Sequence, residues 1–146
     1  MSLEKKEIAV ELRTVIDDQG EKELSIIKQT GKYMKNDEIE VITFSDNVKD
    51  FGEVGNLITI HSDRVNIKRS GSITMNQQFI KGKKTECLYR HPYGSFVIVI
   101  HTKSITHQKL QQNQDGKVII EYEAQLSEQQ KRHHLLTLIY TEEKKL

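Results

Sequence analysis

The sequence predicts an all-β protein that folds as one antiparallel up-and-down barrel of about 8–10 strands. β-Branched residues are abundant, whereas Ala9 and Ala124 are the only alanines. This composition favours strands over helices, because stiff β-branched side chains fit a pleated surface well. Apolar and polar residues alternate with period two along most of the chain, and turn-type segments separate these runs at hairpin distances. A sandwich is compatible with such a series, but a meander of hairpins favours a barrel, since closure removes exposed sheet edges.

The first half of the chain supplies four alternating runs, at residues 8–16, 24–33, 39–44 and 57–61. In the first run Ile8, Val10 and Leu12 fall on one face, as expected for a half-buried strand. Gly31 lies inside the second run, where a glycine indicates a bulge or a bend of the barrel. The polar stretch of residues 45–56 predicts a loop between the third and fourth strands.

The second half continues with short runs at residues 65–69, 73–80, 85–90, 96–100 and 118–126. Residues 96–100 read Phe-Val-Ile-Val-Ile and are apolar on both faces. A strand of this kind is typical of a position covered on both sides, so we expect it to be central.

The last segment has two interpretations. Ser127 and Gln130 have the spacing of a capping box, which would start a helix. Against a helix, Leu136, Leu138 and Tyr140 keep period-two parity. We therefore predict a turn over residues 127–131 and a final strand that ends at Tyr140.

Length and charge restrict the class of protein. A chain of 146 residues is expected to form a single domain over residues 1–146, with residues 1–5 and 142–146 frayed. The balance of 22 basic and 21 acidic residues argues against a general nucleic-acid surface and against a polybasic membrane anchor. The single cysteine, Cys87, excludes an intramolecular disulfide. No signal segment and no run of about 18 apolar residues is found, so we expect a cytoplasmic protein without a membrane partner.

A spaced pattern in the second half resembles the uncharacterised β-barrel family typified by YwiB. The residues that carry the resemblance are Arg69-Ser70-Gly71, Met75-Asn76-Gln77, Phe79, Gly82, Tyr89, Tyr93-Gly94 and Thr102-Lys103-Ser104-Ile105. The order of the flanking strands also follows that family, so the resemblance covers nearly the whole chain. It implies a small calycin-like barrel, related in shape to lipocalins and fatty-acid-binding proteins. It implies no activity, cofactor or catalytic residue.

Arg69 is the first candidate for a ligand-binding residue. It shares parity with Val65 and Ile67, so its guanidinium faces the interior if those side chains do. A buried guanidinium needs a partner, and its planar fork suits a carboxylate or a phosphate. The alternative is an arginine at a strand end whose charged head reaches water.

Five further residues are candidates for the walls of a ligand cavity with Arg69: Met75, Gln77, Phe79, Tyr89 and Tyr122. An eight-stranded barrel can hold one small ligand, or it can be filled by its own side chains. Aromatic and methionine side chains on one strand face are also the composition of an ordinary core. Gln77 would then need a hydrogen-bond partner among them.

No catalytic, metal or cofactor site is predicted. None of the six histidines has the His-x-His spacing that would place two imidazoles on one strand face. Cys87 has no arrangement of histidine and acid beside it in the sequence, which favours an inert thiol. The basic turn of residues 81–84 lacks interleaved aromatic residues and is expected to be a solvated hairpin loop. We therefore do not expect an enzyme.

Two functions remain open from the sequence. The first is an intracellular binding protein whose barrel holds a small amphipathic or anionic ligand. The second is a non-catalytic interaction module, with a barrel filled by side chains and a surface that contacts a protein or an RNA. The sequence identifies neither a protein partner nor a ligand.

Overall fold

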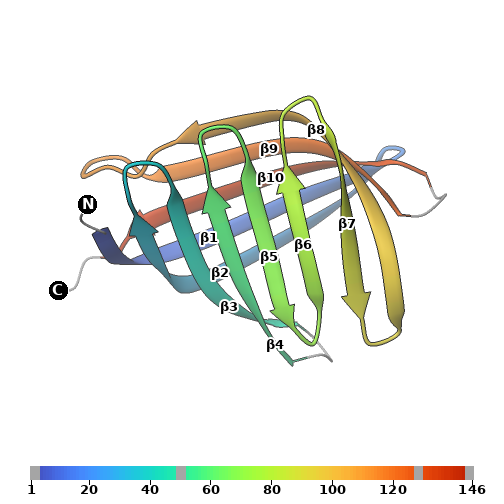
Figure 1. Cartoon of the computed structure of the whole chain (residues 1–146), viewed down its shortest axis with the longest axis horizontal. Coiled ribbons are helices and arrows are strands. Elements are labelled where there is room, and N and C mark those ends of the chain that lie inside the picture. The colour runs from blue at the N-terminus through green and yellow to red at the C-terminus, as the bar shows by residue number, and fades with distance from the viewer. Residues whose placement is uncertain (1–3, 49–51, 127–129, 144–146) are drawn as a thin grey trace.

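The chain folds into a closed barrel of ten antiparallel strands (Figure 1), described in a computed structural model for residues 4–48, 52–126 and 130–143. The strands are β1 (Glu4–Asp18), β2 (Glu21–Lys35), β3 (Glu40–Val48), β4 (Gly52–Ile60), β5 (Val65–Gly71), β6 (Thr74–Phe79), β7 (Lys84–His91), β8 (Gly94–Gln108), β9 (Gly116–Leu126) and β10 (Arg132–Glu142). The described residues contain no helix, and hence none long and apolar enough to cross a membrane.

The topology is that of an up-and-down barrel. Each strand pairs with its neighbours in the sequence, and β1 pairs with β10 from Ile8↔Glu142 to Asp17↔His133 to close the sheet. The sequence-based prediction of an all-β antiparallel barrel is therefore confirmed. Because the other strands are joined as consecutive hairpins, only β1 and β10 pair across the full length of the chain. This one long-range ladder removes the two free edges of the sheet.

The barrel is flattened into two layers (Figure 1). The strands β1, β2, β9 and β10 and the later part of β8 run along the molecule, whereas β3 to β7 cross them steeply and the first part of β8 runs beside β7. The core fills the space between these layers with buried β-branched, leucine and aromatic side chains, among them Ile8, Ile42, Ile58, Ile100 and Leu138. These residues alternate with exposed ones along their strands, which is the pattern expected for a sheet with one face on the core.

The prediction of a loop over residues 45–56 is wrong for most of its length. β3 continues to Val48 and β4 begins at Gly52, with residues 45–48 paired to residues 52–55. Val54 and Asn56 are buried while the residues between and before them face outwards. A strand whose outer face is solvated can be as polar as a loop, so composition alone did not distinguish the two.

The expectation that residues 96–100 are covered on both faces is also wrong. The segment does pair on both sides, with β7 and with β9, but the side chain of Val97 is 46% exposed and that of Phe96 is 37% exposed. β6 and β7 share the register pairs Thr74↔Arg90 and Met75↔Tyr89, and the hydroxyl of Thr85 donates to the backbone oxygen of Gln78. Pairing on both sides thus leaves apolar side chains near the tip of the β7–β8 hairpin exposed to solvent.

The end of the chain forms the predicted strand. β10 runs from Arg132 to Glu142, which excludes the helical interpretation for that stretch, while residues 127–129 of the predicted turn lie outside the described residues. Strand pairing also includes Glu4, Lys5 and Glu142, which we expected to be frayed. Residues 1–3 and 144–146 lie outside the described part.

Gly31 marks a bend of the barrel and not a bulge. The ladder between β1 and β2 is continuous through Ile8↔Gly31, whereas the ladder between β2 and β3 ends at Lys32↔Thr43. A Cβ atom placed on Gly31 would lie 2.5 Å from the backbone oxygen of Thr43. The glycine thus permits a close approach of two strands where the two layers meet.

We predict that Gly31→Ala lowers the free energy of unfolding by about 1–3 kcal/mol, because the new methyl group meets a backbone atom that cannot rotate away. The measurement is urea denaturation. The matched control is Gly55→Ala in β4, where the nearest neighbour of the added methyl group would be the Ser70 Oγ at 3.6 Å. Equal stability of the two variants would contradict the close approach.

Candidate functional site

A buried carboxylate lies at one end of the barrel. Glu40 begins β3, and its side chain is only 5% exposed. A buried charge costs several kcal/mol unless it is paired and hydrogen-bonded. Two phenols meet this requirement at one carboxylate oxygen: the hydroxyl of Tyr33 donates to Oε2 at 2.7 Å, and that of Tyr140 donates to the same atom at 2.8 Å.

His107 lies on the other side of the carboxylate. Its Nε2 is 2.7 Å from Oε1 of Glu40 and 3.3 Å from the hydroxyl of Tyr140. The contact with Oε1 has the distance of an ion pair, and no other donor among the described residues reaches Oε1. With 23% of its side chain exposed, His107 is the most solvent-accessible member of this group.

The charge of Glu40 is fixed by these donors. Burial acts to raise the pKa of Glu40, but the interactions with His107, Tyr33 and Tyr140 outweigh it and lower that pKa below its ordinary value. Burial and the adjacent Glu40 raise the pKa of Tyr140, so its hydroxyl stays protonated and remains a donor. The group is therefore an ionised carboxylate held by neutral phenols, and a carboxylate of this kind is a poor proton donor at neutral pH.

Local structure brings Tyr33 and Glu40 together across a tight turn. The side-chain oxygen of Asn36 accepts hydrogen bonds from the backbone nitrogens of Glu38 at 2.8 Å and Ile39 at 2.9 Å. Such an Asx turn is a common way for asparagine to close a connection between strands. Tyr140 arrives from β10 and stacks on Tyr33, with the ring centroids 5.8 Å apart.

Gly116 leaves the space that the ring of Tyr140 occupies. The two residues are register partners in β9 and β10. A Cβ atom on Gly116 would overlap the ring of Tyr140. The position of the phenol beside Glu40 therefore depends on the absence of a side chain at this point.

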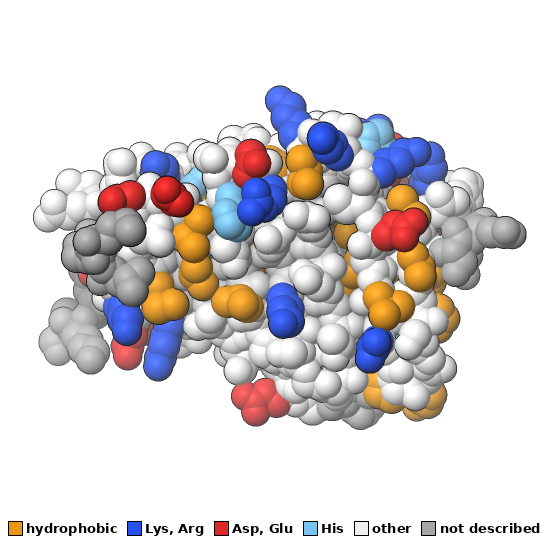
Figure 2. Space-filling view, in the orientation of Figure 1, with side chains coloured by type: hydrophobic (Ala, Val, Ile, Leu, Met, Phe, Trp, Pro, Cys, Tyr) orange, Lys and Arg blue, Asp and Glu red, His pale blue; other side chains and the backbone are white. Residues whose placement is uncertain are grey.

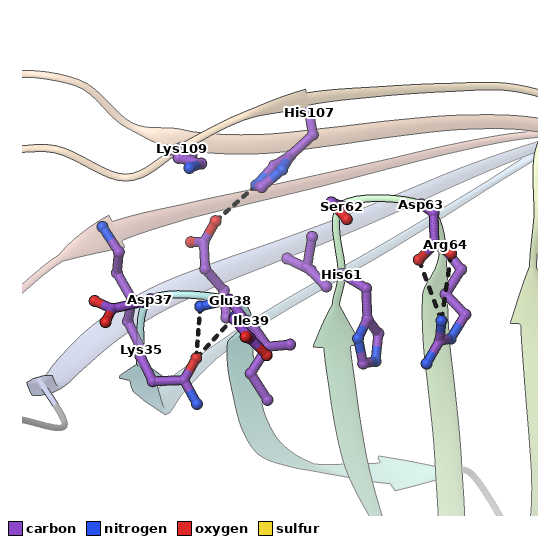
Figure 3. A pocket seen from close by; sticks show the side chains of 13 residues that line it. Lys35, Asp37, Glu38, Ile39, His61, Ser62, Asp63, Arg64, His107 and Lys109 are labelled. Carbon is purple, nitrogen blue, oxygen red and sulfur yellow. Dashed lines mark hydrogen bonds and ion pairs between the residues drawn. The ribbon is translucent and has the colours of Figure 1, made fainter. Parts of the chain in front are cut away.

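A cavity of about 540 Å³ opens at this end of the barrel (Figure 3). It is lined by residues 35–40, residues 60–64, His107 and Lys109. Figure 3 shows the turn between β2 and β3 on one side, the turn between β4 and β5 on the other, and His107 above them. The volume falls within the range typical of small-molecule sites, about 300–1,000 Å³.

Charges of both signs surround the cavity. Its lining includes three cationic side chains, from Lys35, Arg64 and Lys109, and four acidic ones, from Asp37, Glu38, Glu40 and Asp63. Figure 2 shows charged side chains of both signs and a histidine gathered over this part of the molecule. Arg64 pairs with Asp63 at 3.2 Å, whereas Lys35 and Lys109 make no ion pair within the described residues. The lining thus offers both acceptors and donors to a ligand.

The six residues predicted to bind a ligand lie elsewhere, and none of them lines this cavity. Phe79 and Tyr122 are buried and pack together, with ring centroids 4.8 Å apart. Gln77 is hydrogen-bonded to the side chain of Tyr122, and Met75 is buried beside them in β6. These four residues form part of the core, and their role in ligand binding stays a prediction.

Arg69 does face the interior. Its parity partners Val65 and Ile67 are buried, and in the sheet Arg69 pairs with Asn56 on one side and Met75 on the other. Its Nε is buried and has no hydrogen-bond acceptor among the described residues. This unmatched donor is the one feature of the predicted set that is unusual for a core.

Tyr89 continues the same inward row of side chains. It pairs with Met75, and its ring lies 5.9 Å from that of His91 and 6.4 Å from that of Phe96. This ring cluster belongs to the β7–β8 hairpin, and Tyr89 itself packs against the core.

Sequence reasoning missed Glu40 and His107. Glu40 has the parity of Ile42 and Phe44, so its inward direction could have been inferred from the alternation. The inward direction of His107 could not have been inferred from the alternation, because the register of β8 shifts between Thr102 and Ser104. One extra residue reverses the faces of all that follow. The bulge turns His107 inwards, on the same side as Val118 of β9.

Other reactive groups do not extend the site. Cys87 is a buried free cysteine, and burial raises its pKa, which keeps the thiol protonated. No group of three or more histidine, cysteine, aspartate or glutamate side chains within the described residues is placed to hold a metal ion. Glu40 and His107 alone supply two ligands, fewer than the three or four protein ligands of a typical zinc site.

The family described as a domain of unknown function, DUF1934, matches residues 10–138, and the chain belongs to this family. The uncharacterized beta-barrel protein YwiB of Bacillus subtilis (strain 168) is 28% identical over 134 residues, which cover 91% of this chain and 92% of that protein. The crystal structure of the ywiB protein matches with a TM-score of 0.85 at 24% identity, over 96% of this chain and 94% of the other. The predicted resemblance and the barrel fold are confirmed.

A half-buried histidine beside the core makes stability depend on pH. His134 stacks on Tyr122 with a centroid distance of 4.7 Å, and its Nδ1 is buried without a partner in the described part of the chain. Burial, together with the charges of Arg132 and His133, lowers the pKa of His134 from 6.5 to about 4. The unfolded chain therefore takes up a proton before the folded chain does, and stability is lost as the pH falls from 6.5 towards 4.

We predict that His134→Phe makes the melting temperature less dependent on pH between 6.5 and 4, because phenylalanine keeps the ring contact but takes up no proton. Differential scanning calorimetry across this range provides the measurement. His61→Gln, which removes a histidine directly after β4, serves as the control and should follow the wild type. An unchanged slope in His134→Phe would contradict a neutral, buried His134.

We also predict that Glu40→Gln lowers the free energy of unfolding by about 1–3 kcal/mol at pH 7, because two phenols lose a charged acceptor. The folded-state pKa of Glu40 is lowered, so its contribution is present above its ordinary value of 4.5 and is lost as the pH falls through the folded value. Urea denaturation should therefore show the difference from the wild type shrinking as the pH falls below 4.5 and through the lowered folded-state pKa. The control is Glu38→Gln, an exposed change two residues away, which should have little effect on the free energy of unfolding. If the difference in that free energy between Glu40→Gln and the wild type persists at the lowest pH, the result contradicts an ionised Glu40.

Proposed function

We propose that this member of the DUF1934 family is a non-catalytic, cytoplasmic binding protein that holds a small amphipathic ligand at the end of its barrel. The observation that carries the proposal is the cavity of about 540 Å³ that reaches the buried carboxylate of Glu40. Pockets with a few convergent polar groups are the usual sites of small ligands. The cytoplasmic location rests on the single free cysteine, Cys87, which suits a reducing compartment.

The lining of the cavity supports an amphipathic ligand. Ile39 and Ile60 contribute apolar surface next to the charged side chains of the two turns. The buried Glu40 and the cationic Lys109 line the same cavity as these apolar side chains. A ligand with an apolar body and a polar group would satisfy both kinds of surface.

A second location is favoured by the unmatched Nε of Arg69, which would suit an anionic ligand. A carboxylate or phosphate reaching the inner face of β5 would supply the acceptor that the described residues do not. This site lies on a different part of the barrel from Glu40, since Arg69 is not among the residues that line the cavity.

An interaction module is the alternative, and exposed apolar side chains favour it. Leu88 and Val97 are exposed and directly opposite one another on the outer face of the β7–β8 hairpin, and Tyr93 is exposed at its tip. Figure 2 shows hydrophobic side chains along the edge of the molecule at β7 and β8. Contiguous exposed apolar surface is typical of contacts with a protein or another macromolecule.

We predict that the protein, purified from its own cells without denaturation, releases a bound small molecule in a native mass spectrum. Ser62→Trp should abolish the retained mass, because the indole occupies the mouth of the cavity between β4 and β5. Ser72→Trp, an exposed change in the turn between β5 and β6, is the matched control and should retain it.

Three results would redirect the proposal. Loss of the bound mass in Arg69→Met but not in Ser62→Trp would move the site to β5. A spectrum of the protein with a macromolecular partner and no small ligand would support the interaction module. A protein with neither would contradict the ligand-binding function.

A further inference from the structure

We propose that the ligand of this cavity carries a primary ammonium group, and that Glu40 binds it through Oε1. The inference rests on the proposed binding function and names the chemical class of the ligand. It follows from the unequal occupation of the two oxygens of one buried carboxylate.

The two oxygens of Glu40 are in different states. Oε2 accepts two hydrogen bonds, from Tyr33 at 2.7 Å and from Tyr140 at 2.8 Å. Oε1 is buried and has one neighbouring donor within the described residues, Nε2 of His107 at 2.7 Å, and it belongs to a residue that lines the cavity. A buried carboxylate oxygen must keep a donor, so a ligand can reach it only by supplying a donor in place of the imidazole.

His107 is a replaceable neighbour of that oxygen. Its Nε2 lies 2.7 Å from Oε1, and its side chain is the most exposed of the group. Figure 3 shows the imidazole at the edge of the cavity with Lys109 near it, above the two turns that hold the remaining lining residues. If the imidazole moves towards solvent it gives up its contact with the Tyr140 hydroxyl at 3.3 Å, but the hydrogen bonds from Tyr33 and Tyr140 to Oε2 do not depend on it, and an ammonium can take its place beside Oε1.

An ammonium fits Oε1 better than an anion or a neutral group does. It offers three donors and keeps its positive charge at neutral pH. The acidic side chains of Asp37 and Glu38 lie on the turn that enters Glu40, and Arg64 is already paired with Asp63. An anionic group at the same place would face a buried carboxylate of like charge.

The apolar lining defines the rest of the ligand. Ile39 and Ile60 border the same cavity as Glu40. A hydrocarbon chain attached to the ammonium would cover these side chains while the charged end reaches the carboxylate. The ligand class is therefore an alkylamine or a molecule that carries an alkylamine arm.

The test uses three probes of equal length: n-butylammonium, butyrate and 1-butanol. Each is titrated into the full-length protein, and backbone amide shifts are followed by two-dimensional NMR. Butylammonium should shift residues 35–40 and 60–64 saturably, and Glu40→Gln should weaken its binding about tenfold or more, as expected for a lost hydrogen bond to a charged group. Glu38→Gln removes the same charge from the same rim and should change the affinity much less.

A second variant keeps the test independent of the folding of Glu40→Gln. His107→Ala leaves the carboxylate and both phenols in place and removes the competing imidazole, so butylammonium should bind more tightly. Unchanged or weaker binding would overturn the role of Oε1.

The outcomes separate this inference from the proposed function. If butyrate or butanol shifts the two turns and butylammonium does not, the cavity binds ligands but the ammonium inference is wrong. If none of the probes shifts them, the ammonium inference is also wrong, and the bound mass in the Ser62→Trp comparison decides the proposed function by itself.

Discussion

The ladder between β1 and β10 is the constraint on which the rest of the structure depends. It joins the two ends of the sheet over ten residue pairs, from Ile8↔Glu142 to Asp17↔His133, and so turns an open meander into a barrel. The ladder also places Tyr140 opposite Val10, on the inner face. The hydrogen bond from Tyr140 to Glu40 joins residues 100 positions apart in the sequence, and it exists only when the first and last strands are paired. Formation of the candidate site is thus a late consequence of closure, because contacts this distant cost the most loop entropy.

The buried carboxylate couples four strands at one end of the barrel. Tyr33, Glu40, His107 and Tyr140 come from β2, β3, β8 and β10, and the tyrosine rings also stack on one another. An apolar cluster of similar volume would stabilise the same junction at a smaller desolvation cost. The charge is held in a fixed position by neutral phenols, and the residue that carries it lines a cavity. A buried charged group beside a cavity costs stability, and such groups are typical of binding sites.

Period-two alternation predicted the barrel, the final strand and the inward direction of Arg69, because burial on one face dictates parity residue by residue. The alternation failed where a strand is polar on its outer face and where a bulge reverses which face points inwards. Residues 45–56 were mistaken for a loop because the outer face of β3 and β4 is polar. His107 was missed because the bulge between Thr102 and Ser104 reverses the faces of β8, and one extra residue leaves no compositional mark. The partners of Glu40 could not be inferred at all, because they meet through tertiary closure and not through spacing.

The shape of the barrel explains why its cavity lies at one end. Ten strands in a round barrel would enclose more space than side chains can fill, and such barrels commonly hold ligands in the middle. Here the sheet is flattened, so that β3 to β7 cross the longer strands as a second layer (Figure 1). Opposite walls of packed layers lie about 10 Å apart, and side chains such as Phe79 and Tyr122 fill that gap. Free volume is then left where the layers part, at turns such as those before Glu40 and after Ile60. Analogy with hollow barrels would place a cavity among the aromatic residues of the core, whereas the packing of this chain leaves its cavity at the rim, beside the residue that carries the buried charge.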